Sequence, residues 1–377
     1  MVMHCSSFSI VAVFVTITLL QGCSDDNESQ EQERTVFRMS GTDLVDPCGE
    51  KIILKGVNKM SVFDEVDISG EEYFPEIAKT GSNCVRIVWR VTNQDGTPTS
   101  LTRFETLIKN CIANKMIPMV ELHDATCDWG LLDEMVDYWV RPDVVELIQR
   151  YEHALLVNIA NEAGDGNVTA QQFTDGYKSA ITRMRDAGIR TPLIIDAQTC
   201  GQELDILVPT SAALIAHDPD HNIMFSVHPY WSKIAILQAQ PTFIKDQLKK
   251  AKDNNIPLIL GELCGYGGWP GNGEPKQEIC NEKGSIDYQT LLAEAAANNF
   301  GYLVWEWGPG NAVYEVNPPY PCPGMDITTD GTYESVEDIV PGSIPRAWIR
   351  DVIIDSPHSI KNTAQKTSYI LNGFTCQ

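Results

Sequence analysis

The amino-acid sequence predicts a single α/β domain folded as a (β/α)8 TIM barrel. Between about residues 52 and 307, eight short apolar runs of strand-like composition alternate with amphipathic helical stretches. The first three runs begin at residues 52, 84 and 116, and this spacing is that of a strand, a loop and a crossover helix. Runs that are apolar throughout are typical of parallel strands buried on both faces.

The expected elements follow one another regularly. Amphipathic stretches such as 71–81, 101–115, 170–188 and 288–299 should form helices, and several of them end in Gly or Asn. A doubly wound open sheet is the alternative fold, but the turn after the first strand reads GVNKMSVF, without a GxGxxG or Walker motif. We therefore expect the closed barrel, with its chemistry at the carboxyl ends of the strands. The expected strands are Ile52–Val57, Cys84–Trp89, Met116–Leu122, Ala154–Ala160, Pro192–Ala197, Ile223–Val227, Ile256–Gly261 and Tyr302–Trp307.

The composition indicates a globular protein and limits its partners. The 377 residues include 28 Lys and Arg against 51 Asp and Glu, a formal net charge of −23, and 43% of them are hydrophobic. A surface this acidic repels phosphate backbones, so nucleic acid and anionic lipid surfaces are poor partners. An uncharged polysaccharide is compatible with this charge.

The amino-terminal residues are expected to direct export. Ser9–Leu20 is an apolar run of the length found in signal peptides. It leads into Leu20-Gln21-Gly22-Cys23, which resembles the bacterial lipoprotein cleavage box, in which the Cys becomes the lipidated first residue. We expect a lipoprotein signal peptide over 1–22, a lipidated Cys23 with a flexible polar tether over 23–36, and the barrel domain over 37–377. The chain would then be anchored to a membrane at the cell surface or in the periplasm; a plain secretory signal with a chance Cys is the alternative.

Cysteine usage agrees with export. Of the 11 Cys, two lie at or before the expected cleavage site, and the odd number that remains leaves at least one thiol free. We expect a disulfide among Cys264, Cys280 and Cys322, which lie in Gly- and Pro-rich surroundings. Cys84 and Cys111 should be buried thiols in core elements. No CxxC pair or His-Cys cluster indicates zinc, so no metal site is expected.

Two carboxylates stand out at the expected strand ends. Glu162 follows the fourth strand and Glu262 follows the seventh, so the barrel would bring them to one mouth. Glycosidic cleavage needs such a pair, one to protonate the departing oxygen and one to attack or stabilise the anomeric carbon. Aromatic rings at the rim suit the C–H faces of sugars. The other candidates at strand ends are Arg86, His123, Asn161, His228, Tyr230, Trp305 and Trp307.

Several blocks resemble a known family. The chain from about Phe37 to Cys376 is similar to glycoside hydrolase family 5, a retaining group with Asn-Glu after strand four and a second Glu after strand seven. It most resembles the bacterial endo-β-1,4-mannanase branch. The blocks that carry this resemblance are GVN (56–58), AKTGSNCVRIV (78–88), VELHDAT (120–126), VNIANE (157–162), FSVHPY (225–230) and LILGELCG (258–265).

The resemblance implies a role for each candidate. Glu162 would be the acid/base and Glu262 the nucleophile, held ionised by Arg86. Asn161 would contact the sugar 2-hydroxyl, and Trp305 would form the floor on which the sugar stacks. The remaining members of the reacting subsite would be His123, His228 and Tyr230. No cofactor or metal is implied. The structural alternatives are a buried salt bridge for Arg86 and backbone-satisfied core positions for the two histidines.

Three departures from the branch concern the substrate. Ala163 follows the Asn-Glu pair where an aromatic residue or proline is common, Cys200 stands where Trp usually precedes Gly-Gln, and Cys264 lies just after the nucleophile. We expect a retaining, endo-acting hydrolase of β-1,4-mannan or glucomannan. An endo-β-1,4-glucanase is the nearest alternative, and a non-catalytic glycan-binding lipoprotein is the alternative from another class. Four further tryptophans lie near the expected strand ends and are either additional sugar platforms or ordinary packing residues: Trp89, Trp129, Trp231 and Trp269.

Overall fold

The computed structural model describes residues 36–232, 236, 239–265, 286–308, 326–328, 330–337 and 347–376. The expected signal peptide over 1–22 and the tether over 23–36, except for its last residue, lie outside the described residues, as does Cys23. Among the described residues, no helix combines the length and the apolar character needed to cross a bilayer.

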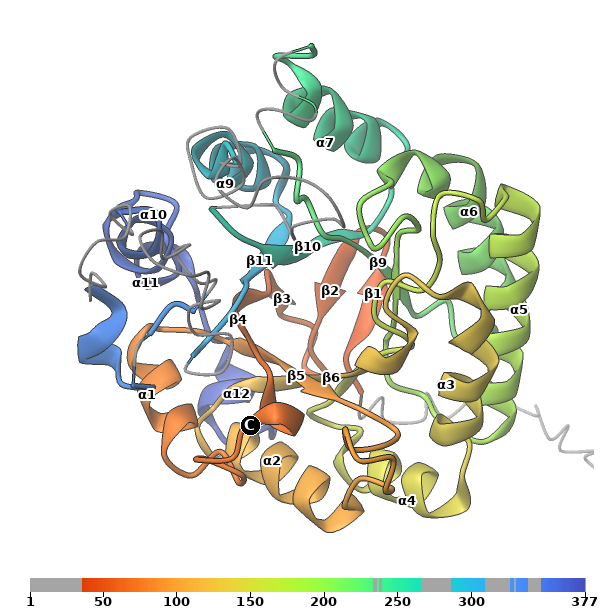
Figure 1. Ribbon diagram of the computed structural model, residues 1–377, viewed down its shortest axis with the longest axis horizontal. Helices are drawn as coiled ribbons and strands as arrows, with labels where there is room; N and C mark the ends of the chain where they lie inside the picture. The colour runs from red at the N-terminus through yellow and green to blue at the C-terminus, as the bar shows by residue number, and fades with distance from the viewer. Residues whose placement is uncertain are drawn as a thin grey trace, which may run out of the picture. The chain divides into compact units, whose positions relative to one another are not determined.

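Eight parallel strands close into a barrel, as predicted (Figure 1). Strand β11 pairs in parallel with β4, with Tyr302 opposite Lys55, so the sheet has no free edge. Every residue of the eight strands is buried, which explains why most of their residues are apolar. In chain order they are β4 (Lys55–Lys59), β5 (Cys84–Trp89), β6 (Ile117–Leu122), β7 (Leu156–Asn158), β8 (Leu193–Asp196), β9 (Ile223–Val227), β10 (Leu258–Leu263) and β11 (Gly301–Val304).

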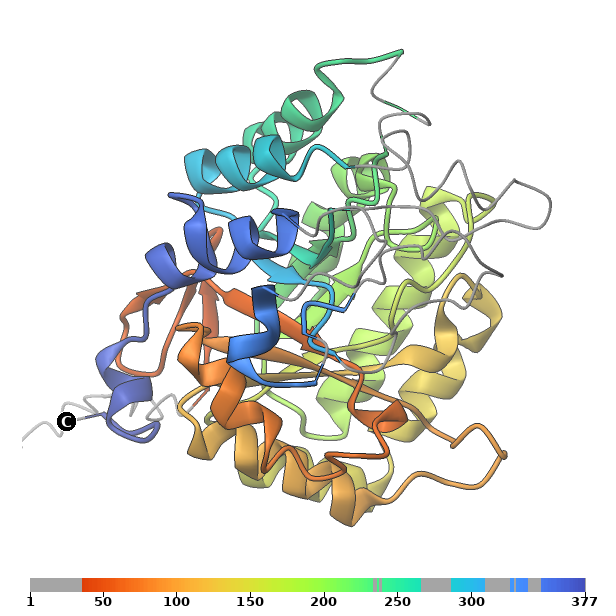
Figure 2. The same ribbon diagram turned by 60° about the vertical axis from the view of Figure 1, so that its left-hand side comes forward.

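Helices surround the strands and cover their outer face (Figures 1 and 2). The boundaries follow local chemistry: Thr169 caps α5 in a capping box with Gln172, and Asn299 ends α9 in the left-handed conformation. The longer helices are α1 (Tyr73–Lys79), α2 (Leu101–Ala113), α3 (Leu132–Trp139), α4 (Pro142–Tyr151), α5 (Ala170–Asp186), α6 (Leu207–His217), α7 (Phe243–Asp253) and α9 (Tyr288–Asn298). Shorter ones are α10 (Ala347–Arg350), α11 (Ile360–Thr363) and α12 (Ser368–Leu371).

A small antiparallel sheet, not predicted from the sequence, precedes the barrel. It consists of β1 (Arg38–Ser40), β2 (Asp43–Val45) and β3 (Lys51–Ile52). Its Leu44 and Ile52 join a buried cluster with the first residues of the barrel strands and with α12, so the sheet lies at the amino ends of the strands. The prediction of one strand over Ile52–Val57 was therefore wrong. Lys51 and Ile52 pair with β2, and the barrel strand begins only at Lys55.

In the part of the chain that the structure describes, two disulfides join segments far apart in the sequence, and neither was predicted. Cys48 is bonded to Cys376, and Cys127 to Cys200. Cys84 and Cys111 are buried thiols, as expected. Cys264 is also buried, while the other two members of its expected disulfide group, Cys280 and Cys322, lie outside the described residues.

Candidate active site

The fully buried Arg86 on β5 organises the carboxyl end of the barrel. Its guanidinium donates hydrogen bonds to Glu262 (2.9 Å), Asn161 (2.6 Å) and Asn58 (3.1 Å), and two more to Asn158. Burial disfavours the charge of Arg86, but the surrounding carboxylates, above all Glu121 and Glu262, raise its pKa. Arg86 therefore stays charged, and its planar donors fix the positions of side chains from three other strands, β4, β7 and β10.

Glu262 lies on β10 with both carboxylate oxygens hydrogen-bonded. Oε1 accepts from Arg86, and Oε2 accepts from the Tyr230 hydroxyl at 2.6 Å. Burial raises the pKa of Glu262, while Arg86 first, and the neighbouring His123 and Tyr230 after it, act against that increase. Burial and the charge of Glu262 also raise the pKa of Tyr230, so its hydroxyl keeps the proton that it donates.

Glu162 comes four residues after the end of β7, in a turn with left-handed backbone (φ 49°). Its amide donates to Asp196 at 3.0 Å, and its Oε1 is 2.7 Å from His228 Nδ1. Burial and then the charge of Glu262 raise the pKa of Glu162 well above its usual range. Glu162 is therefore the carboxyl that keeps a proton, and Glu262, beside Arg86, is the one that ionises first.

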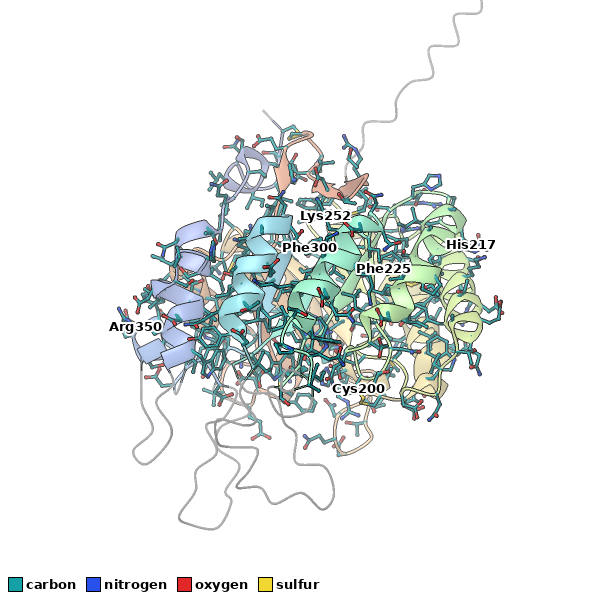
Figure 3. All side chains as sticks on the ribbon, turned by 90° about the horizontal axis from the view of Figure 1, so that it is seen from above. Cys200, His217, Phe225, Lys252, Phe300 and Arg350 are labelled. Carbon is teal, nitrogen blue, oxygen red and sulfur yellow. A yellow bond between two sulfur atoms is a disulfide. The ribbon has the colours of Figure 1, made fainter. Side chains whose placement is uncertain are left out.

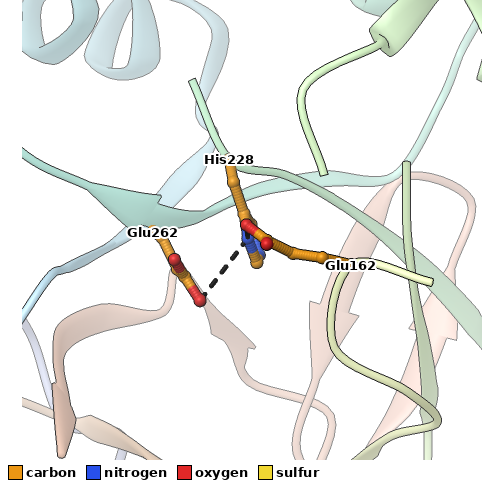
Figure 4. Close-up of side chains that lie close together, drawn as sticks. All are labelled: Glu162, His228 and Glu262. Carbon is orange, nitrogen blue, oxygen red and sulfur yellow. Dashed lines mark hydrogen bonds and ion pairs between the residues drawn. The ribbon is translucent and has the colours of Figure 1, made fainter. Parts of the chain in front are cut away.

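The two carboxyl groups share one small space. One oxygen of Glu162, one of Glu262 and a ring nitrogen of His228 all lie within 4.8 Å of one another. Figure 4 shows the three side chains converging from different strand ends. A metal ion would fit this spacing, but each carboxylate already has protein partners, and Arg86 supplies positive charge to Glu262.

His228 fits this space because two glycines leave room for it. A Cβ on Gly201 would lie 2.8 Å from the His228 ring, and a Cβ on Gly261 would lie 2.8 Å from its Nε2. Gly201 also accepts the His228 backbone N–H at 2.8 Å. Burial, followed by the positive charge of Arg86, lowers the pKa of His228 well below its usual range, so its imidazole is neutral.

His123 and Trp305 form an aromatic pair beside the carboxylates. Their rings stack at 5.9 Å, nearly parallel, and Glu121 holds His123 Nδ1 at 3.0 Å. Trp305, directly after β11, is 5% exposed, so only a narrow part of its ring faces solvent. The rings of Phe63 and His123 also meet nearly at right angles, with their centroids 6.4 Å apart.

Three further tryptophans near the strand ends, Trp89, Trp231 and Trp307, are buried packing residues. Trp89 and Trp231 are 1% exposed, so the alternative of a sugar platform is wrong for both. Trp307 is fully buried, and its indole N–H donates to the Gly331 carbonyl. Trp129 stacks on Phe173 and packs against the core. Trp269 lies outside the described residues.

Two site residues were missed in the sequence. Asp196, the last residue of β8, is fully buried and accepts hydrogen bonds from the Glu162 amide and from Asn158. Asn158 in turn accepts two hydrogen bonds from Arg86. The available signal was a polar residue inside an otherwise apolar strand, because such a residue must find buried partners.

Comparison with known proteins agrees with this geometry. A family model described as "Cellulase (glycosyl hydrolase family 5)" matches residues 45–311. The chain belongs to glycoside hydrolase family 5. The predicted enzyme class, a glycoside hydrolase, is therefore confirmed, as is the family resemblance.

Curated family 5 relatives include enzymes named mannan endo-1,4-β-mannosidase. The one from Streptomyces lividans is 32% identical over 284 residues, which cover 74% of this chain and 67% of the relative. The one from Cellvibrio japonicus is 25% identical over 88% of this chain and 69% of the relative.

Solved structures of the family share the fold. A β-mannanase from Streptomyces thermolilacinus with mannohexaose superposes with a TM-score of 0.70 at 24% identity, over 89% of this chain and 98% of that one. The catalytic domain of a Thermobifida fusca endoglucanase gives a TM-score of 0.56 at 16% identity, over 87% of this chain and 99% of that one. At these identities the likeness concerns the fold alone.

Proposed function

We propose that this family 5 enzyme is an endo-acting β-1,4-mannanase that cleaves mannan or glucomannan with retention of configuration. The observation that carries the proposal is the pair of buried carboxyl groups, Glu162 and Glu262, with oxygens within 4.8 Å of each other. Carboxyl groups this close leave no room for a water between enzyme and sugar, so one of them attacks directly, as in retaining glycosidases.

In the first step Glu262 attacks the anomeric carbon. The glycosidic C–O bond breaks as the Glu262–carbon bond forms, and the proton of Glu162 passes to the departing sugar oxygen. In the second step the ionised Glu162 takes a proton from water, whose oxygen displaces Glu262. Both carboxyls return to their starting states, and no cofactor is needed.

The neighbouring residues make the two roles unequal. Arg86 and Tyr230 stabilise the Glu262 anion, and Glu162 has the higher pKa. The lowered pKa of His228 makes its neutral ring a weak base, so it hydrogen-bonds Glu162 without taking the proton of that carboxyl. Asn161, held by Arg86, is placed for the sugar 2-hydroxyl, and Trp305 with His123 offers the floor for the sugar ring.

The proposed substrate rests on the relatives. Three curated relatives carry the mannosidase name, and a fourth is named β-mannanase/endoglucanase A. The net charge of −23 suits an uncharged polymer.

A hydrolysis panel tests the proposal. Galactomannan, glucomannan, carboxymethylcellulose and xylan are incubated with the enzyme, and reducing ends are measured. We expect release from the two mannans, and NMR of the first product should show the β-anomer. Strong release from carboxymethylcellulose with none from galactomannan would identify a glucanase instead. An α-anomer as first product would reject the double displacement.

We also propose that the chain is exported and lipidated at Cys23. The support is the apolar run Ser9–Leu20 followed by Leu-Gln-Gly-Cys, and the polar tether after it. In a bacterial host, radiolabelled palmitate should label the wild-type chain and send it to the membrane fraction, whereas Cys23→Ser should remain unlabelled. Labelling of the variant would contradict the assignment.

A further inference from the structure

The Cys127–Cys200 disulfide lies across the strand end that carries Glu162. Cys127 follows β6 and Cys200 follows β8, and β7 lies between these two strands in the barrel. Figure 3 shows Cys200 at the end of the barrel away from the small sheet β1–β3. The disulfide therefore joins the two loops that flank the Glu162 turn.

Both half-cystines also hold that turn through their backbones. The Cys127 amide donates to the Glu162 carbonyl at 3.0 Å, and the Cys200 amide donates to the Gly164 carbonyl at 2.9 Å. Thr126 and Ala163 form an antiparallel bridge beside them. Hydrogen bonds from the loops on both sides thus hold the Glu162 turn, and the disulfide links these two loops covalently.

The backbone at this point needs such support. Glu162, Cys127 and Cys200 all have positive φ values, between 49° and 59°, a conformation that costs about 1–3 kcal/mol for each residue other than glycine. Residues in this conformation relax when the surrounding structure loosens. Opening the disulfide would therefore change the backbone conformation at Glu162.

The same loop supports the partner of Glu162. Gly201, next to Cys200, accepts the backbone N–H of His228, and His228 is hydrogen-bonded to the Glu162 carboxyl. Loosening the Cys200 loop thus displaces Glu162 by two routes, through its own turn and through His228. Glu262 is held mainly by Arg86 at 2.9 Å and Tyr230 at 2.6 Å, with His228 Nδ1 farther away, 3.5 Å from its Oε1.

We propose that Cys127 and Cys200 are positioning residues, whose disulfide holds the acid/base Glu162 in place for proton transfer to the leaving group. This inference rests on the proposed role of Glu162. Opening the disulfide should affect the two parts of the first step differently: it weakens protonation of the leaving group by Glu162 and leaves attack by Glu262 intact.

The leaving group of the substrate distinguishes this role from a general structural one. A sugar leaving group needs the proton from Glu162, whereas dinitrophenolate departs without it. Misplacement of a catalytic group by about 1 Å costs on the order of 100-fold. For Cys127→Ser/Cys200→Ser we expect kcat/KM to fall roughly 10- to 100-fold on mannohexaose. On dinitrophenyl mannobioside it should stay within about twofold, since kcat/KM covers only the steps through formation of the glycosyl-enzyme.

The pH profile gives a second readout. Burial contributes most to the raised pKa of Glu162. A loosened turn admits water and lowers that pKa, so the alkaline limb of kcat/KM on mannohexaose should move to lower pH. The acid limb, which follows Glu262, should stay in place.

The matched control is Cys48→Ser/Cys376→Ser, which removes the disulfide near the small sheet and leaves the site untouched. This control variant should have the wild-type kcat/KM on both substrates and the wild-type positions of both limbs of the pH profile. If the Cys127/Cys200 variant does not fold, the control variant is reduced with a phosphine after folding, which opens Cys127–Cys200 in the native barrel. The same selective loss is expected, with near-UV circular dichroism unchanged.

Two results would overturn the proposal: equal loss on both substrates, or no loss on either. Failure of the proposed function shows separately, in the wild type. An enzyme that cleaves cello-oligosaccharides but no mannosides refutes the mannan assignment, and the selective loss is then measured with cellohexaose and dinitrophenyl cellobioside. The acid/base role itself is tested with a variant: a Glu162→Ala enzyme that retains full activity on the oligosaccharide refutes that role.

Discussion

Replacing Tyr230 by Phe tests how the nucleophile is kept ionised. The Tyr230 hydroxyl donates to Glu262 Oε2 at 2.6 Å, and this hydrogen bond lowers the pKa of Glu262. A hydrogen bond to a charged group contributes about 1.5–3 kcal/mol, and one pKa unit corresponds to about 1.4 kcal/mol. Loss of the hydroxyl should therefore raise the pKa of Glu262 by about 1–2 units.

The sign of the effect on activity follows directly. Glu262 attacks only when it is ionised, so activity appears as the pH rises through its pKa. In Tyr230→Phe the acid limb of kcat/KM should move to higher pH by about 1–2 units, while the alkaline limb, set mainly by Glu162, moves little. The two carboxyls interact, so the limbs report apparent values of the pair.

Tyr302→Phe is the matched control. Tyr302 on β11 is buried, and its hydroxyl donates to the His358 carbonyl at 2.6 Å, away from the carboxyl pair. Both variants lose one partly buried hydrogen bond, which costs about 1 kcal/mol of unfolding free energy for the neutral bond of Tyr302 and about 1.5–3 kcal/mol for the bond from Tyr230 to a charged group. Only the Tyr230 variant should shift the acid limb. An acid limb that stays in place, or moves to lower pH, would refute this account of Glu262.

Three further outcomes are expected. Glu262→Ala should abolish turnover but keep retardation in galactomannan affinity gels, and added azide should restore turnover on dinitrophenyl mannobioside with an α-azide product. Because burial raises the pKa of Glu162, its ionisation opposes folding, so Glu162→Gln should raise Tm at neutral pH. This gain should vanish at low pH, where Glu162 is protonated in both the folded and the unfolded wild type. Gly201→Ala and Gly49→Ala should each lower the free energy of unfolding by about 1–2 kcal/mol, since both positions have positive φ. Only Gly201→Ala, whose new Cβ meets His228, should also lower kcat. Azide without effect, a lower Tm for the Gln variant at neutral pH, or an unchanged kcat for Gly201→Ala would each contradict the structural reasoning.

Most of the barrel was predictable because its strands are buried on both faces. Cys84–Trp89 and Ile223–Val227 match β5 and β9 residue for residue. The small sheet was not predictable, since strands of two or three residues are too short to show a period of two. The run at Ile52–Val57 was misassigned because one apolar segment serves two sheets in succession.

The carboxyl pair was predictable from strand-end positions, but its supports were not. Glu162 and Glu262 stand out because the barrel brings strand ends together. Asp196 becomes recognisable only once β8 is known to pair with β7, which places it beneath the Glu162 amide. The Cys127–Cys200 disulfide depends on two loops, 73 residues apart, meeting over β7, and sequence spacing carries no sign of that meeting.

The Cys48–Cys376 disulfide makes the barrel a covalent ring. The two cysteines lie 328 residues apart, and the stretch between them contains all eight barrel strands. A protease that cuts one loop within this stretch opens the ring without releasing a fragment, and the halves stay at high effective concentration. A nicked enzyme should run at full size on a non-reducing gel, fall into two bands after reduction, and continue to digest its substrate until then.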